Sequence, residues 1–157
     1  MKTIIATIGL MLACICSRAE SPVSTNELDV IEAEFRYQFQ HNTSGAQTNA
    51  AVFFIAMGRE TTPPDEFLAR FKDVSTPVKA SSESIRDDAN GSRITDAITG
   101  QVGLLFTHSE IHWITDTKAE VICLMAEANQ SRSVKRLTIE LIDGRWVVTK
   151  DELIAIS

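Results

Sequence analysis

The sequence predicts one α+β domain, in which a long N-terminal helix and a short second helix pack on a mostly antiparallel sheet. A helical apolar period runs from Leu28 to Phe39, and a continuous apolar run follows at Ala50–Met57. From Val102 onward, strand-like runs alternate with turn residues, which is typical of a β-meander. The length of 157 residues fits one domain, and an apolar fraction of 44% excludes wholesale disorder.

Residues 1–19 predict a signal peptide that is cleaved, leaving residues 20–157 as the domain. Lys2 supplies a short positive region, Thr3–Ile15 is almost entirely apolar, and Ser17-Arg18-Ala19 offers small residues for cleavage before Glu20. The apolar run is shorter than the roughly 20 residues that a membrane span needs. We therefore expect an exported protein, periplasmic or extracellular.

A second processing route stays open, because Met11-Leu12-Ala13-Cys14 resembles a degenerate bacterial lipobox. Lipidation at Cys14 would tether the protein to a membrane, and we expect membrane contact only in that case. The first two residues of this tetrapeptide match the pattern poorly, so the soluble product is favoured.

Charge and cysteine content exclude several classes of partner and fold. A net charge of −6 without a cluster of Lys and Arg argues against nucleic acid as a partner. Cleavage after Ala19 would leave Cys123 as the single cysteine, so no internal disulfide is expected. Cys123 lies in the apolar stretch Val121–Met125, which predicts a buried strand and an unreactive thiol with a raised pKa.

The first half of the domain predicts two helices and two strands. Ser24 and Glu27 have the spacing of a capping box that opens a helix running to about Gln40. Four apolar residues at helical spacing form its buried face: Leu28, Ile31, Phe35 and Phe39. Ala50–Met57 predicts a strand covered on both faces. A short helix is expected to start at Pro63–Glu66, and Thr76–Ser82 predicts an edge strand.

The second half predicts a long loop and then the meander. Ser84–Gly100 has little periodicity and is expected to be a loop. The expected strands follow: Val102–Thr107, Glu110–Thr115, Lys118–Ala128, Val134–Ile142 and Arg145–Ile154. Asp143-Gly144, between the last two, is the strongest hairpin signal in the chain.

This order of elements resembles the nuclear transport factor 2-like superfamily, whose members include ketosteroid isomerases and polyketide cyclases. The segment Asp143-Gly144-Arg145-Trp146 looks like a hairpin common in secreted bacterial members, and Ile111–Val121 is similar to the preceding strand pair of an uncharacterised bacterial branch. The resemblance implies a cone-like, curved sheet around the first helix, with a pocket between them. Neither segment is specific for an activity.

The resemblance also implies which side chains face inward, namely Tyr37, Phe53, Ile55, Trp113 and Leu124. In enzymes of the superfamily the pocket holds an acidic base, but no acidic residue stands at a clearly inward strand position here. We therefore expect no catalytic set. The expected ligand-binding residues are Tyr37, His41, Phe53 and Trp113, of which Tyr37 and His41 form an i, i+4 pair at the end of the helix.

His108, Glu110 and His112 have the spacing of metal ligands on one strand face. A bend at Ser109-Glu110 would disturb that alternation, and Ile111 and Trp113 are the natural inward pair, so solvated histidines are favoured over a metal site. Signatures of phosphate, dinucleotide and common hydrolase sites are absent from the sequence, and no cofactor is expected.

Three functions are therefore compared. The first is an exported non-enzymatic domain that binds a small apolar ligand or a protein partner. The second is an enzyme of the isomerase or cyclase type with a pocket at the open end of the cone. The third is a homodimer that pairs through the outer face of the long strands. A buried acid with a raised pKa would favour the enzyme.

Overall fold

The computed structural model describes residues 25–41, 49–58, 61–87, 92–128 and 131–156. The expected signal peptide, Cys14 and the capping residue Ser24 lie outside the described residues. The helices are α1 (Thr25–His41) and α2 (Asp65–Leu68), and a 3-10 turn, Ala69–Phe71, continues α2. The strands are β1 (Val52–Met57), β2 (Val78–Ala80), β3 (Ser84–Asp87), β4 (Arg93–Asp96), β5 (Gly103–Thr115), β6 (Lys118–Ala128), β7 (Ser131–Ile142) and β8 (Arg145–Ile156).

The strands form one mixed sheet. β1 is parallel to both of its neighbours, β2 and β5, whereas β5, β6, β7 and β8 follow one another in antiparallel order. The β3–β4 hairpin joins β6 through a single pairing between Arg93 and Ala128. The α+β class is confirmed, but the long helix is not N-terminal, because residues 1–24 precede it.

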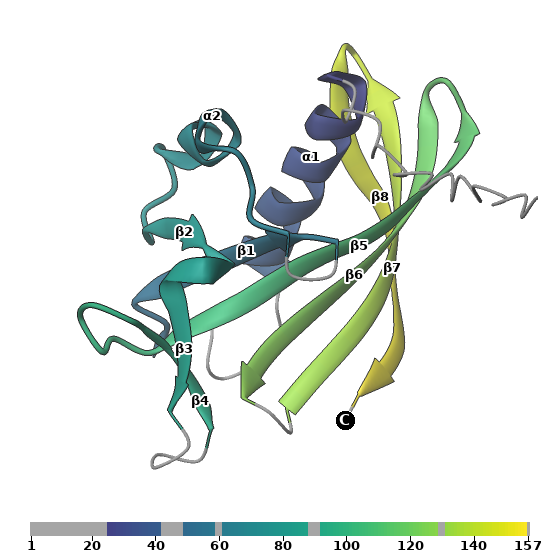
Figure 1. Ribbon diagram of the computed structural model, residues 1–157. Helices are drawn as coiled ribbons and strands as arrows, with labels where there is room; N and C mark the ends of the chain where they lie inside the picture. Colours follow the sequence, from purple (N-terminus) through teal and green to yellow (C-terminus); the bar gives the residue numbers. More distant parts are fainter. Residues whose placement is uncertain (1–24, 42–48, 59–60, 88–91, 129–130, 157) are drawn as a thin grey trace, which may run out of the picture.

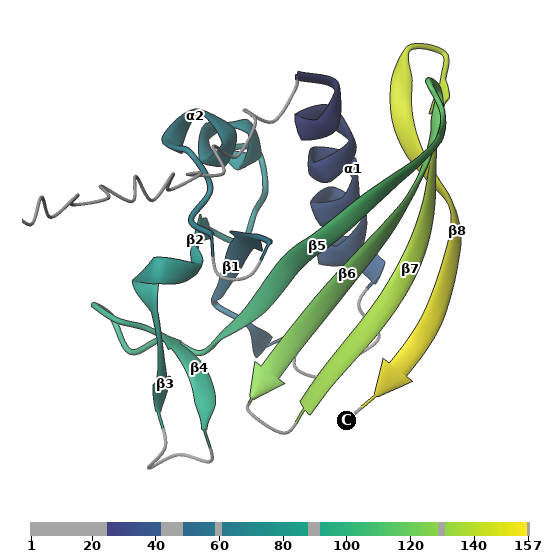
Figure 2. The same ribbon diagram turned by 45° about the vertical axis from the view of Figure 1, so that its right-hand side comes forward.

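Helix α1 lies against one face of the long strands, which twist and curve beside it (Figures 1 and 2). Its apolar residues face the sheet as expected, with Ile31, Phe35 and Phe39 buried. Phe39 packs against Phe53 of β1 and Phe106 of β5, with ring centroids 4.9 and 5.2 Å apart. Farther along the sheet, a second buried cluster joins Val30 of α1 to β6 and β7; its other members are Ala119, Val121, Cys123, Leu137 and Ile139.

The opposite face of β1 is covered by the hairpin β3–β4. Ile94 of β4 packs with Val52 and Phe54 of β1, and all three are buried. β1 is therefore buried on both faces. This confirms the prediction, made from its continuous apolar run, of a strand covered on both sides. The prediction of a loop at Ser84–Gly100 was wrong, because this segment contains the β3–β4 hairpin.

Two further corrections concern β5 and β6. The two short strands expected between Val102 and Thr115 are one strand, β5, whose register with β6 shifts between His108 and Glu110. Such a shift is a bulge, which re-aims the side chains that follow it. Leu124 does not face α1, because its neighbours Cys123 and Met125 occupy that face; Leu124 packs with the cluster on the hairpin side.

Candidate functional site

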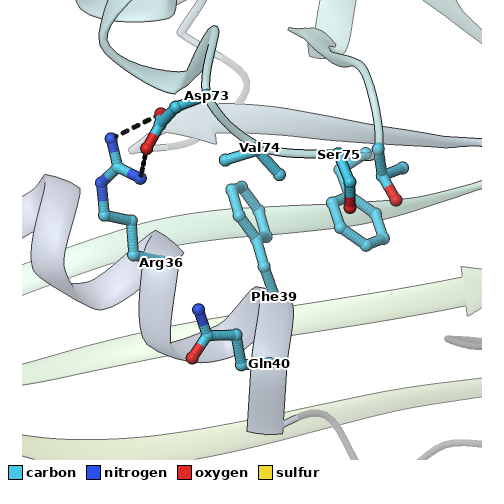
Figure 3. A pocket seen from close by; sticks show the side chains of 8 residues that line it. Arg36, Phe39, Gln40, Asp73, Val74 and Ser75 are labelled. Carbon is cyan, nitrogen blue, oxygen red and sulfur yellow. Dashed lines mark hydrogen bonds and ion pairs between the residues drawn. The ribbon is translucent and has the colours of Figure 1, made fainter.

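An open groove of about 660 Å³ lies beside the second half of α1 (Figure 3). It lies between the helix and the chain that leads into β2. Its lining residues are Arg36, Phe39, Gln40, Phe53, Asp73, Val74, Ser75 and Thr76.

One end of the groove is held by Arg36. Its guanidinium donates two hydrogen bonds to Asp73, each 3.0 Å long, a bidentate arrangement that fixes both side chains (Figure 3). It also donates to Glu32 Oε1 at 2.8 Å and to the carbonyl oxygen of Arg70 at 2.6 Å. The hydrogen bonds from Arg36 hold the pKa of the Asp73 carboxyl below its usual range. The groove therefore has a preformed, charged end.

The floor of the groove is aromatic. Phe39 and Phe53 line it while remaining almost fully buried, so only their edges reach the hollow. Ser75, by contrast, is exposed on the far wall. The groove therefore presents a charged end, an aromatic floor and a polar wall within one hollow.

A second feature is a buried polar network between α1 and β5. Glu34 is fully buried, and its Oε2 lies 2.6 Å from Nδ1 of His108. Gln38, one helical turn further, donates from Nε2 to Glu34 Oε1 at 2.9 Å. Burial raises the pKa of the Glu34 carboxyl, and the contact with His108 opposes that shift.

Sequence reasoning missed Glu34, although a signal was present. The expected inward positions were sought on strands, whereas Glu34 lies on the helix. It follows Val30 by one helical turn, and Val30 belongs to the buried side of α1. This spacing places Glu34 on the same side of the helix as Val30.

The structure also corrects the interpretation of His108. The residue was expected on the surface, but only 8% of it is exposed, and it faces α1. Because the bulge follows it, Glu110 and His112 point to the outer face and are exposed. The three side chains therefore do not converge on one point. Among the described residues, no group of three or more acidic, histidine or cysteine side chains could hold a metal ion.

The four expected ligand-binding residues do not lie together. Phe53 lines the groove, whereas Trp113 packs on Trp146 near the other end of the sheet, with ring centroids 5.6 Å apart. Tyr37 and His41 stack at 4.1 Å, and the Tyr37 hydroxyl donates to Asp151 of β8 at 3.2 Å. The role of these residues in binding stays a prediction.

A small hollow of about 10 Å³ lies beside His41 and Lys135 and reaches Gln38. This volume is about that of one water molecule. A third hollow, of about 320 Å³, lies between α1 and the turn after β7 and is lined by Trp146. Neither Glu34 nor His108 lines any of the three hollows.

Within the described part of the chain, no helix combines the length and apolar character needed to cross a membrane. Comparisons with protein-family models, curated proteins and solved structures find no match to this chain.

Proposed function

We propose that this chain is an exported, non-enzymatic binding domain that holds a segment of a protein partner in the groove beside α1. The observation that carries the proposal is the groove itself, which joins an aromatic floor to the fixed Arg36–Asp73 ion pair. Export, the cone-like shape of the sheet and kinship with the nuclear transport factor 2-like superfamily belong to the same proposal.

The shape of the groove favours a protein segment over a small apolar ligand. Pockets for small ligands enclose most of the ligand surface and are lined mainly by apolar groups. Here the hollow is open, and Arg36, Gln40, Asp73 and the Ser75–Thr76 wall surround the two phenylalanines. A segment with one or two apolar side chains and flanking polar groups matches this lining.

A second function, an enzyme of the isomerase or cyclase type, is favoured by Glu34 alone. A buried carboxyl with a raised pKa beside a histidine is suited to acid–base chemistry. Catalysis also needs a space where substrate touches the acid, and Glu34 lines none of the three hollows. The binding function is therefore preferred.

The test uses photo-crosslinking in the exported fraction of the source cell. Ser75→p-benzoylphenylalanine places the probe on the groove wall, and His112→p-benzoylphenylalanine places it on the outer face of the sheet as a matched control. We expect a protein adduct from the first variant and none from the second, and Phe39→Ala should weaken the adduct. Equal adducts from both positions would contradict the proposal.

Native mass spectrometry of the purified protein separates the alternatives. A retained small molecule displaced by Phe39→Ala would show that the groove binds a small ligand instead of a protein segment. The same protein tests the processing: cleavage after Ala19 predicts a chain starting at Glu20, and lipidation predicts a modified Cys14. An uncleaved N-terminus would refute export by a signal peptide.

A further inference from the structure

Strand β8 is an edge strand of the sheet among the described strands. Among the described strands it pairs only with β7, and Figure 2 shows it as the outermost strand. It spans Arg145–Ile156, which makes a long edge. The backbone groups along such an edge can pair with a strand of another chain.

The regular part of this edge is short and charged. The register between β7 and β8 shifts at Thr149 and again at Ile154, so bulges bracket the stretch from Lys150 to Leu153. Lys150 and Glu152 lie on the outer face, 3.3 Å apart. Asp151 points the other way and binds Lys135 Nζ at 2.7 Å. Bulges at both ends limit pairing to a few residues and oppose open-ended association.

The charges of this stretch complement a second copy of it. When two identical strands pair in antiparallel order, a two-fold axis sets one residue opposite its own copy. With Asp151 on the axis, Lys150 of each copy lies opposite Glu152 of the other. The two Asp151 carboxylates then face each other, and each is bound by Lys135 of its own chain. Placing the axis at Lys150 or at Glu152 would lose both of these pairs. Opposite charges directly across an antiparallel pair stabilise it.

We propose that two copies of this chain pair edge to edge through β8, with Asp151 on the two-fold axis. Apolar side chains at the C-terminal end of the charged stretch support this choice. Leu153, Ile154 and Ile156 are 52%, 46% and 74% exposed, although they belong to a strand. A second β8 beside them removes part of this apolar surface from water.

The outer face of the long strands is a poorer surface for pairing. Lys118 binds Glu140 at 3.0 Å across it, and Arg136 lies 3.8 Å from Glu152. Packing a second sheet on this face would take these charges out of water, which costs more than the ion pairs return. Pairing through the edge of β8 leaves these outer-face charges in contact with solvent.

The test exchanges charges at two exposed positions and measures mass by sedimentation equilibrium. Wild type is expected to be a dimer at tens of micromolar. K150E and E152K each replace two attractive pairs by two repulsive ones, so each variant alone should dimerise at least about tenfold more weakly. An equimolar mixture of K150E and E152K should recover a mixed dimer, because each residue 150 again faces a residue 152 of opposite charge.

The double variant K150E/E152K serves as the matched control and should dimerise as wild type does. Circular dichroism checks that each variant keeps the fold. A monomeric wild type at 100 micromolar would overturn the proposal. So would a dimer that persists in both single variants, which would point to another surface, or a mixture that stays monomeric.

Discussion

Glu34 is the most deeply buried acidic residue in the described part of the chain. Its hydrogen-bond partners are His108 and Gln38. The charge of Glu34 also contributes to the raised pKa of the nearby Cys123 thiol. Burial disfavours the charged form of Glu34, so the folded protein holds this proton more tightly than the unfolded chain does. Stability is therefore expected to fall as pH rises from the ordinary pKa of 4.5 through the raised pKa of Glu34.

Glu34→Gln should remove this pH dependence, because an amide of the same shape does not titrate. The measurement is urea unfolding of wild type and variant at steps from pH 4 to pH 8. As pH rises, the free energy of unfolding of wild type should fall relative to that of Glu34→Gln. Glu110→Gln, at an exposed position, should follow the wild-type curve throughout. Parallel curves for wild type and Glu34→Gln would contradict the assignment.

His108→Leu should be severely destabilising, because it leaves the Glu34 carboxyl buried without its histidine partner. Leaving a buried polar group without its hydrogen-bond partner typically costs about 1–3 kcal/mol, and more when the group is charged. The double variant Glu34→Leu/His108→Leu should regain much of that loss, since two apolar side chains need no partner. Chemical unfolding of the four proteins completes the cycle, and additive losses would show that the pair does not interact.

Cys123 should be inert in the native protein. It is fully buried on β6, and burial raises the pKa of its thiol well above the usual range. Ellman's reagent should react with it at least about a hundredfold more slowly in buffer than in denaturant, since the reactive species is an exposed thiolate. The assay uses a C14S/C16S background so that only this thiol is counted. Rapid reaction in buffer would contradict the burial of Cys123.

Among the elements, those with a strong periodic or turn signal were predictable. Helix α1 carries apolar residues at regular spacing, and the Asp143-Gly144 turn joins β7 to β8 with φ angles of 49° and 76°. Such angles favour these two residue types, so the hairpin could be read from the chain. Predicted bounds for β6 were also correct.

The elements that were missed depend on contacts between distant segments. β3 and β4 lack a strong pattern of their own, yet Ile94 is buried because the hairpin covers Phe54 of β1. The bulge in β5 was taken as a break between two strands. β1 pairs with β5 only as far as His108, whereas β6 pairs with β5 both before and after the bulge. Continuous pairing with β6 holds β5 together where local sequence would end it.

Two glycines allow a comparison of backbone strain with crowding. Gly144 has a φ of 76° and open space around it, so Gly144→Ala should cost about 1 kcal/mol through conformation alone. At Gly103 an added Cβ would lie 2.6 Å from the carbonyl oxygen of Val52. Overpacking typically costs about 1–3 kcal/mol, so Gly103→Ala should be the more destabilising in thermal melts. The reverse order would contradict the close approach of β1 and β5.

For the whole molecule, acid should weaken the fold through Asp96. Its carboxylate accepts from Lys79 Nζ at 2.6 Å and from the backbone N–H of Thr99 at 2.8 Å, which ties β2 to the end of β4. These contacts lower the pKa of Asp96 well below its ordinary 3.8. Asp96 therefore contributes its full stabilisation above pH 3.8, the pKa in the unfolded chain. That stabilisation is lost as the pH falls from 3.8 through the lowered pKa of the folded protein.

Asp96→Asn should be less stable than wild type at pH 7, and the difference should narrow toward pH 2. Asp116→Asn, at an exposed turn position, is the control and should match wild type at both pH values. Unfolding by urea at several pH values makes the comparison. A difference that does not change with pH would show that the charge of Asp96 is not what holds β2 and β4.

The candidate site was only partly predictable from the sequence. Phe53 was expected to face inward and does line the groove, but the contact between Arg36 and Asp73, from a distant part of the chain, was not predicted. A side chain with a long stem and a charged end gives no sequence signal for the partner it will reach. The contact between Arg36 and Asp73 forms the charged end of the groove.

The parallel placement of β1 between β2 and β5 also bears on how the chain folds. Short turns join β5 to β8 in sequence, so pairing these strands closes only small loops. Pairing β1 with β5, which begins at Gly103, closes a much longer loop. We expect the C-terminal meander to form first and the aromatic cluster under α1 to close last. A chain threaded N-terminus first through a secretion channel would then stay unfolded, and so easy to translocate, until Gly103 and the residues beyond it had emerged.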